Sequence, residues 1–162
     1  MEYPRSEDDQ KVWKILAYTM HQRIPIALLQ ETHLSAHTAM RLRGVWLGES
    51  VVSSYLSYAR GIAILVRRSL QWQTVDAYLD LGGRYTILNG VAIGRKVTIA
   101  VIYGPNVDTP DVFLQIWHRI MSNGTTGVVW GGDYNVVLEL MMDSSSAARR
   151  QRSYRSLLMT TW

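Results

Sequence analysis

The sequence predicts a layered α/β sandwich in a single domain. Segments with the pattern of buried strands alternate with amphipathic segments at helical spacing, and this mixture is typical of layered α/β folds. Of the 162 residues, 48% are hydrophobic and 19% are charged, which is the balance of a chain that buries its own core. We find no internal repeat, low-complexity tract or linker, so we expect one domain over residues 1–162.

The first half of the chain is predicted to begin with a helix. Ser6 and Asp9 resemble a capping box, and apolar residues then recur on one face until about Gln22. Pro25 separates this helix from the next segment. The elements predicted to follow are a strand at Ile26–Glu31, a short helix around Ala36–Leu42 and an apolar strand at Gly61–Arg67.

In the second half, Gly94-Arg95-Lys96 lies between two apolar runs and predicts a hairpin turn. Thr109-Pro110-Asp111 is a helix start, with a capping threonine, a proline at the first helical position and an acid beside it. Apolar residues repeat at helical spacing from Phe113 to Met121, and Asn123-Gly124 ends the helix. The strands predicted here are Tyr85–Ile93, Val97–Tyr103 and Val128–Gly131.

The composition excludes several classes of protein. The chain has no cysteine, which excludes disulfides and thiolate metal sites. Its longest apolar runs are far shorter than the roughly 20 residues of a membrane-spanning helix. The acidic N-terminus lacks the hydrophobic core of a signal peptide. We therefore expect an intracellular protein with no membrane partner.

The charge is uneven along the chain. The formal net charge is +4, and Arg149, Arg150, Arg152 and Arg155 lie within seven residues near the C-terminus. Such a cluster can neutralise the phosphates of a nucleic acid, and it can equally be the solvated face of a helix.

Polar side chains follow two of the predicted strands. The apolar run Val128–Trp130 leads through two glycines to Asp133 and Asn135, which we expect to point the same way because side chains alternate along a strand. The strand Ile26–Glu31 likewise ends in a carboxylate, with His33 two residues further on. Hard cations prefer carboxylate oxygens, so the sequence predicts a Mg²⁺ and phosphate site where these strands end.

Three ordered motifs resemble the endonuclease/exonuclease/phosphatase superfamily, which has the DNase I-like fold. They are Gln-Glu-Thr-His at 30–33, Ile-Tyr-Gly-Pro-Asn at 102–106 and Gly-Gly-Asp-Tyr-Asn at 131–135. The endonuclease domain of LINE-type retrotransposon proteins is the most similar branch, since it also has segments like 60–65 and 83–85 in this order. His33 favours that branch over abasic-site endonucleases, which usually have lysine there. The resemblance runs from about Lys11 to the C-terminus.

This resemblance implies hydrolysis of DNA phosphodiesters and a nuclear location for the parent element. It also implies a role for each matching residue. Glu31 would be the ligand of Mg²⁺, with Mn²⁺ as a substitute, and Asp133 would orient or deprotonate the attacking water, while Asn135 would hold the phosphate or that water. Tyr103 would contact the scissile phosphate with Asn106 beside it, and His33 would orient the site.

Simpler structural roles remain open for these residues. Glu31 can cap the next segment, and Asp133 and Asn135 can form an Asx turn that bonds only local backbone. Tyr103 can be an ordinary residue at the rim of the core. His33 and His37 are four positions apart, but no third ligand lies at a recognisable zinc spacing.

The resemblance is incomplete at both ends of the chain. The superfamily begins with a strand that leads to an Asn-Val-Asn-Gly-like segment and ends with a Ser-Asp-His-like motif, and neither has a counterpart here. No histidine follows Asp133. We therefore expect a domain truncated at both ends, weakly active or inactive, with exposed sheet edges that favour self-association. The alternatives are a non-catalytic nucleic-acid-binding remnant of a mobile element and a small-phosphoester phosphatase of the same superfamily.

Overall fold

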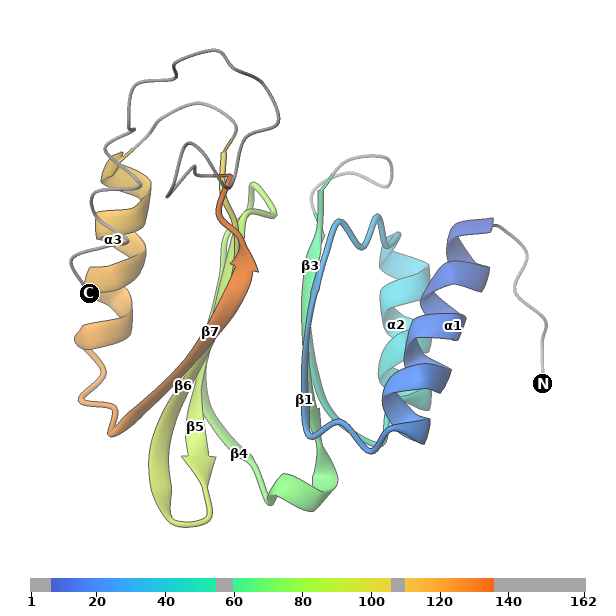
Figure 1. Ribbon diagram of the computed structural model, residues 1–162, viewed down its shortest axis with the longest axis horizontal. Coiled ribbons are helices and arrows are strands. Elements are labelled where there is room, and N and C mark those ends of the chain that lie inside the picture. Colours follow the sequence, from blue (N-terminus) through green and yellow to red (C-terminus); the bar gives the residue numbers. More distant parts are fainter. Residues whose placement is uncertain (1–6, 55–59, 106–109, 136–162) are drawn as a thin grey trace, which may run out of the picture.

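The computed structural model describes residues 7–54, 60–105 and 110–135. These residues form four layers, shown edge-on in Figure 1. Helices α1 (Glu7–His21) and α2 (Ala36–Val45) cover one sheet, and helix α3 (Pro110–Met121) covers the other. The two sheets face each other in the middle. The predicted layered α/β sandwich is confirmed.

The first sheet has three strands in the order β1-β3-β2, and the second has four in the order β4-β5-β6-β7. Within the described part of the chain, all neighbouring strands are antiparallel except β6 and β7, which are parallel. A short 3₁₀ helix, η1 (Arg68–Leu70), leads from the first sheet to the second. The strands are β1 (Ile26–Gln30), β2 (Gly48–Ser53), β3 (Ile62–Arg67), β4 (Gln73–Leu79), β5 (Tyr85–Ala92), β6 (Arg95–Tyr103) and β7 (Gly127–Asp133).

Strand β3 is buried on both faces, which explains its unbroken apolar sequence. Its Ile62, Ile64 and Val66 pack between the sheets, whereas Ala63 and Leu65 face the helices α1 and α2. The second sheet is also covered on both faces. Three residues of α3 pack on its outer side: Phe113, Ile116 and Ile120.

Two strands escaped the sequence analysis because polar residues interrupt their patterns and leave no long apolar run. Strand β2 begins Gly-Glu-Ser, and most residues of β4 are at least partly exposed. Both lie at an edge of their sheet, where strands need few apolar residues. The helix predicted around Ala36–Leu42 runs on to Val45.

The predicted hairpin is confirmed, but its turn is shorter and begins one residue earlier than Gly94-Arg95-Lys96. Arg95 and Lys96 belong to β6 and pair with residues of β5, so the turn consists of Ile93 and Gly94. Both turn residues have positive φ, 51° and 74°. A two-residue turn with positive φ at both positions matches the twist of the flanking strands, so the chain turns before the two charged residues.

The fold brings the ends of three strands together. Strands β1, β6 and β7 all end at the same edge of the sandwich, at the top of Figure 1, and β1 lies against β6 and β7. None of the described helices is long and apolar enough to cross a membrane.

Candidate functional site

Glu31 is the first residue after β1 and leaves the extended conformation with a φ of 47°. The two residues that follow it remain attached to the start of β3. The backbone N–H of Thr32 donates to the carbonyl of Gly61 (3.0 Å), and that of His33 donates to the carbonyl of Arg60 (3.1 Å). This turn holds the exposed Glu31 carboxylate at the edge between the two sheets.

Tyr103 ends β6, and its hydroxyl donates a hydrogen bond of 2.7 Å to Oε1 of Glu31. Its backbone N–H donates to the carbonyl of Arg84 (2.6 Å). The hydrogen bond with Glu31 and partial burial raise the pKa of Tyr103, and the charges of Glu31 and Asp133 raise it further. The positive charge of Arg60 lowers this pKa. Glu31, Asp133 and Arg60 therefore all lie within electrostatic reach of one phenol oxygen.

Asp133 is the last residue of β7 and lies opposite Tyr103 in the parallel pairing. Its Oδ1 accepts a hydrogen bond from the backbone N–H of Asn135 (2.9 Å), and Asn135 has a φ of 50°. The Nδ2 of Asn135 donates to the carbonyl of Gly104 (2.6 Å). The Asp133 side chain thus forms an Asx turn with the backbone of Asn135, and the predicted alternation along a strand does not extend to Asn135 because β7 ends at Asp133.

Gln30 fastens the two sheets together at this edge, and its role did not emerge from the sequence. Its Nε2 donates to the carbonyl of Ile102 (2.8 Å), which joins the end of β1 to the end of β6. Gly132 passes so close that a Cβ there would overlap both groups. The adjacent glycines of the Gly-Gly-Asp-Tyr-Asn motif were the signal for such a close approach.

Arg60 also spans the two sheets. It precedes β3, and its Nη1 donates to the carbonyl of Gly82 in the turn between β4 and β5 (3.2 Å). His33, predicted to orient the site, lies two residues after Glu31 with a φ of 48° and is partly buried. Asn106 and the arginine cluster at 149–155 lie outside the described residues.

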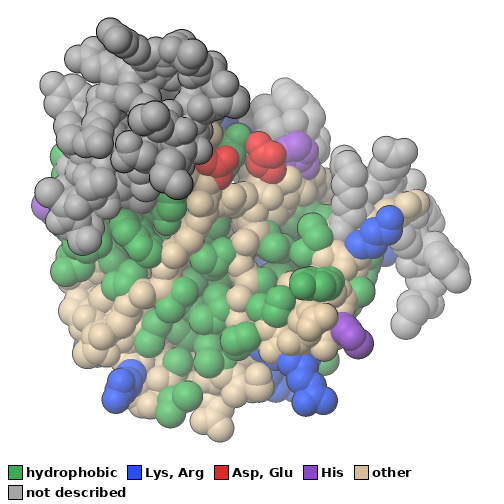
Figure 2. Space-filling view, viewed as in Figure 1, with side chains coloured by type: hydrophobic (Ala, Val, Ile, Leu, Met, Phe, Trp, Pro, Cys, Tyr) green, Lys and Arg blue, Asp and Glu red, His purple; other side chains and the backbone are tan. Residues whose placement is uncertain are grey.

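The described residues offer few ligands for a hard cation. Among the described residues, no group of three or more acidic or histidine side chains is placed to hold a metal ion. Glu31 and Asp133 offer carboxylate oxygens near Tyr103. Mg²⁺ usually keeps several waters and takes only one or two protein carboxylates together with substrate phosphate, so two carboxylates suffice for such an ion. Figure 2 shows acidic side chains beside a histidine at this edge.

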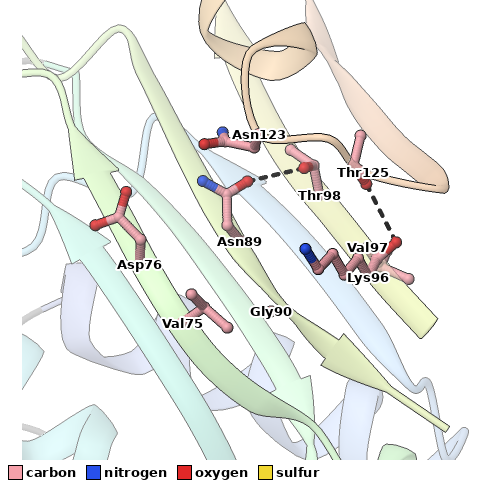
Figure 3. A pocket seen from close by; sticks show the side chains of 9 residues that line it. All are labelled: Val75, Asp76, Asn89, Gly90, Lys96, Val97, Thr98, Asn123 and Thr125. Carbon is pink, nitrogen blue, oxygen red and sulfur yellow. Dashed lines mark hydrogen bonds between the residues drawn. The ribbon is translucent and has the colours of Figure 1, made fainter. Parts of the chain in front are cut away.

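One cavity lies beside the candidate site, and another lies far from it. One of about 290 Å³ is lined by Glu31, Thr32 and His33 together with apolar residues of α1, α2 and β1. The other, of about 100 Å³, lies at the opposite end of β6 (Figure 3). There the hydroxyl of the buried Thr98 donates to Oδ1 of the buried Asn89 (2.8 Å). The first cavity adjoins Glu31.

The model of the Endonuclease/Exonuclease/phosphatase family matches residues 4–159. The chain belongs to this family. Its DNase I-like fold agrees with the resemblance inferred from the three motifs. Endonucleases, exonucleases and phosphatases hydrolyse phosphoester bonds, and this is the general chemistry of the family. No curated protein sequence matches the chain.

Solved structures support the fold assigned to this family member. One is Danio rerio TDP2 complexed with single strand DNA product, which is 15% identical with a TM-score of 0.57 over 80% of this chain and 54% of that one. A 3′ phosphatase, NExo from Neisseria bound to a product DNA hairpin, is 18% identical (TM-score 0.55, 80% and 55% covered). An AP endonuclease from Archaeoglobus fulgidus is 17% identical (TM-score 0.53, 77% and 52%). The chain thus spans just over half the length of these proteins.

Proposed function

We propose that this chain derives from a Mg²⁺-dependent endonuclease of the LINE retrotransposon type that hydrolyses phosphodiesters of DNA, and that the 162-residue chain is weakly active or inactive. The observation that carries the proposal is the hydrogen bond between Glu31 and Tyr103, with Asp133 beside them. It unites residues of all three motifs at one edge of the sandwich. Two of the similar structures are described as bound to DNA, which favours DNA as the partner. A nuclear location of the parent element belongs to the same proposal.

Each residue would contribute one step of hydrolysis. Glu31 would hold Mg²⁺, which when bound supplies positive charge to stabilise the phosphoryl oxygens. Asp133 would accept a proton from the attacking water or orient it. Tyr103 has a raised pKa and so remains protonated; its single O–H donates to Glu31 in the free protein and would donate to a phosphate oxygen instead when the substrate is bound. Asn135 would hold the phosphate or the water through its amide.

Two further residues complete the proposed site. Asn106 would lie beside the phosphate, and His33 would orient the segment that carries Glu31. No histidine follows Asp133 in the chain. A general acid or base is typically worth about 10²–10⁴ in rate, so its absence is the reason for expecting little activity.

Metal binding tests the site independently of activity. Isothermal titration with Mg²⁺ or Mn²⁺ should give weak binding to the wild type and weaker binding to Glu31→Gln. The matched control is Asp76→Asn, which removes an exposed carboxylate from β4 in the second sheet. Equal binding by the wild type and Glu31→Gln would rule out Glu31 as the ligand.

A supercoiled plasmid tests the chemistry, because a single nick is detectable. Nicking by the 162-residue chain should be absent or barely above background. Adding a Ser-Asp-His-containing terminal segment and an opening strand from a related endonuclease should restore nicking, and Asp133→Ala should then abolish it. Strong nicking by the unmodified chain that survives Glu31→Gln would refute the proposed site.

The second candidate function is non-catalytic binding of nucleic acid. It is favoured because the residues that the structure describes contain no group of three or more acidic or histidine side chains that could hold a metal ion. DNA binding without metal-dependent nicking, even in the extended protein, would select this candidate.

A further inference from the structure

The end of the sandwich opposite Glu31, at the bottom of Figure 1, is formed by five connecting segments. They are residues 20–26, 43–49, 66–73, 92–96 and 121–127. The backbone N–H of Arg67 donates to the carbonyl of Pro25 (2.8 Å), and that of Arg68 donates to the carbonyl of Leu47 (3.0 Å), so three of the segments are in contact. The other two meet where β7 begins beside β6.

These segments carry more positive charge than the chain as a whole. Their basic residues are Arg23, Arg43, Arg67, Arg68, Arg95 and Lys96. Their one acidic residue is Glu49, so the six positive charges and one negative charge leave +5, against +4 for all 162 residues. On the face drawn in Figure 2, basic side chains lie along the lower margin, whereas the acidic side chains lie at the upper edge. We call the five segments the basic end.

Two arginines of the basic end have a structural role. Arg43 lies in the last turn of α2, where a cation offsets the negative end of the helix dipole. The Nη1 of Arg67 donates to the carbonyl of Met20, close to the end of α1 (3.3 Å). Packing and capping thus explain both residues, and the inference rests on two others, Arg23 and Arg68.

Arg23 occupies a position that favours glycine. The N–H of Ile24 donates to the carbonyl of Thr19 (3.1 Å), and that of Arg23 donates to the carbonyl of Met20 (3.2 Å). These are the two bonds of a Schellman motif, which holds Arg23 in the left-handed conformation with a φ of 53°. A residue with a side chain is strained there. The exposed guanidinium makes no hydrogen bond or ion pair within the described residues that would explain an arginine at this point.

We propose that the basic end binds the phosphate backbone of a nucleic acid, with Arg23 and Arg68 as two of the contacts. Arg68 is exposed at the start of η1. Exposed cations spread over several segments match a chain of phosphates better than a single anion. The choice of a nucleic acid among polyanions rests on the proposed function. The surface is separate from the candidate site, because the nine residues of β6 set the two ends roughly 30 Å apart.

The variant Arg23→Gly distinguishes this role from a structural one. Glycine relieves the left-handed strain, so the free energy of unfolding in urea should stay equal or rise while binding weakens. An arginine that only supports the fold would lose stability instead. Arg68→Gln removes the second charge. The matched control is Lys14→Gln, which removes an exposed charge from the middle of α1, outside the basic end.

The experiment measures binding of a short fluorescent DNA duplex to the full chain by anisotropy, with EDTA present, over a series of NaCl concentrations. We expect Arg23→Gly and Arg68→Gln each to lower the affinity roughly 3- to 10-fold and to reduce the slope of log K against log[NaCl] by about 1. The double variant should reduce the slope by about 2. Lys14→Gln should behave like the wild type.

Several results would overturn this assignment. These are a wild-type affinity and slope in the double variant, an equal loss in Lys14→Gln, or no binding of the duplex by the wild type. Binding to vesicles that contain phosphatidylserine, without binding to the duplex, would assign the surface to a membrane and also overturn it. If urea unfolding shows that Arg23→Gly is not folded, Arg68→Gln decides, and an unchanged slope refutes the contact. Failure of the hydrolysis proposal is separate, because no hydrolysis takes place in EDTA and these results would stand without any nicking.

Discussion

Glu31 and Tyr103 are 72 positions apart in the sequence, yet their side-chain oxygens are 2.7 Å apart. Both groups are near solvent, so their hydrogen bond contributes little to the stability of the fold. Its consequence is chemical. A phenol that donates to a carboxylate resists ionisation because the phenolate and the carboxylate would repel each other, and this keeps the pKa of Tyr103 above its usual range.

Removing the charge of Glu31 should reverse this effect. In Glu31→Gln we expect the pKa of Tyr103 to fall back toward 10.0, because the anionic acceptor that favoured the protonated phenol is gone. The measurement is a pH titration of ¹³Cζ-labelled tyrosine by NMR, with Tyr103→Phe to assign the signal. Asp76→Asn serves as the control. A Tyr103 pKa that stays elevated in Glu31→Gln would show that Glu31 is not its partner in solution.

Tyr85 makes stability sensitive to alkaline pH. Burial, followed by a hydrogen bond with Tyr78, raises its pKa from 10.0 to about 12. Between these two values the unfolded chain has released a proton that the folded chain still holds, so stability falls as pH rises from 10 toward 12. Below pH 10 the contribution is fully present.

Urea unfolding at a series of pH values checks this behaviour. Tyr85→Phe should flatten the loss of unfolding free energy between pH 10 and 12, because phenylalanine has no proton to release. The exposed Tyr18 on α1 provides the control variant Tyr18→Phe, which should keep the wild-type slope. Identical slopes in all three proteins would assign the alkaline transition to other groups.

At the scale of elements, the site depends on how closely three strand ends approach. Gly132 on β7 has a φ of 151°, and it lies against the hydrogen bond by which Gln30 of β1 reaches Ile102 of β6. A side chain at this glycine cannot be accommodated without moving backbone. The absence of a side chain at this position therefore allows β7 to lie this close to β6 and to Gln30 of β1.

Replacing Gly132 by alanine should lower the free energy of unfolding by about 2–4 kcal/mol, through backbone strain and loss of close packing. Gly44 in α2 is the opposite case, since a Cβ there has nothing within 4 Å. Gly44→Ala should stabilise the protein by roughly 0.5–1 kcal/mol. Urea denaturation measures both. A Gly132→Ala protein as stable as the wild type would contradict the close approach.

At the scale of the whole molecule, the edge strands of the two sheets lie on the same two flanks. Strands β1 and β7 are edge strands on one flank, and β2 and β4 are edge strands on the other, within the described part of the chain. Figure 2 views the flank with β1 and β7 and shows hydrophobic side chains across it. Val128 and Val129 of β7 are 38% and 41% exposed. Exposed edge strands with few charges can pair with strands of another molecule.

We therefore expect the isolated chain to self-associate at micromolar concentration. Light scattering coupled to size-exclusion chromatography should detect oligomers, and Val129→Lys should reduce them because a lysine on an edge strand opposes pairing. Leu81→Lys, at a 90% exposed position in a turn, should leave association unchanged. A monomer for the wild type, or equal effects of the two lysines, would argue against pairing through β7.

Local sequence patterns predict much of the architecture. The apolar run Gly61–Arg67 predicted the strand β3, and the apolar spacing of Phe113–Met121 predicted α3. The motifs placed Glu31, Tyr103 and Asp133 at or just past strand ends, where the structure has them. These features follow from the neighbours of each residue along the chain, so the sequence alone suffices for them.

Other features depended on how the layers stack. The bond from Gln30 to Ile102, the contact of Arg60 with Gly82 and the meeting of Glu31 with Tyr103 all join the two sheets. No local pattern encodes such distances, because they depend on the register and stacking of strands that are far apart in the sequence. Strands β2 and β4 escaped notice for a different reason, because strands at a sheet edge need few apolar residues. The sequence determined which side chains stand at strand ends, and the packing of one sheet on the other decided which of them meet.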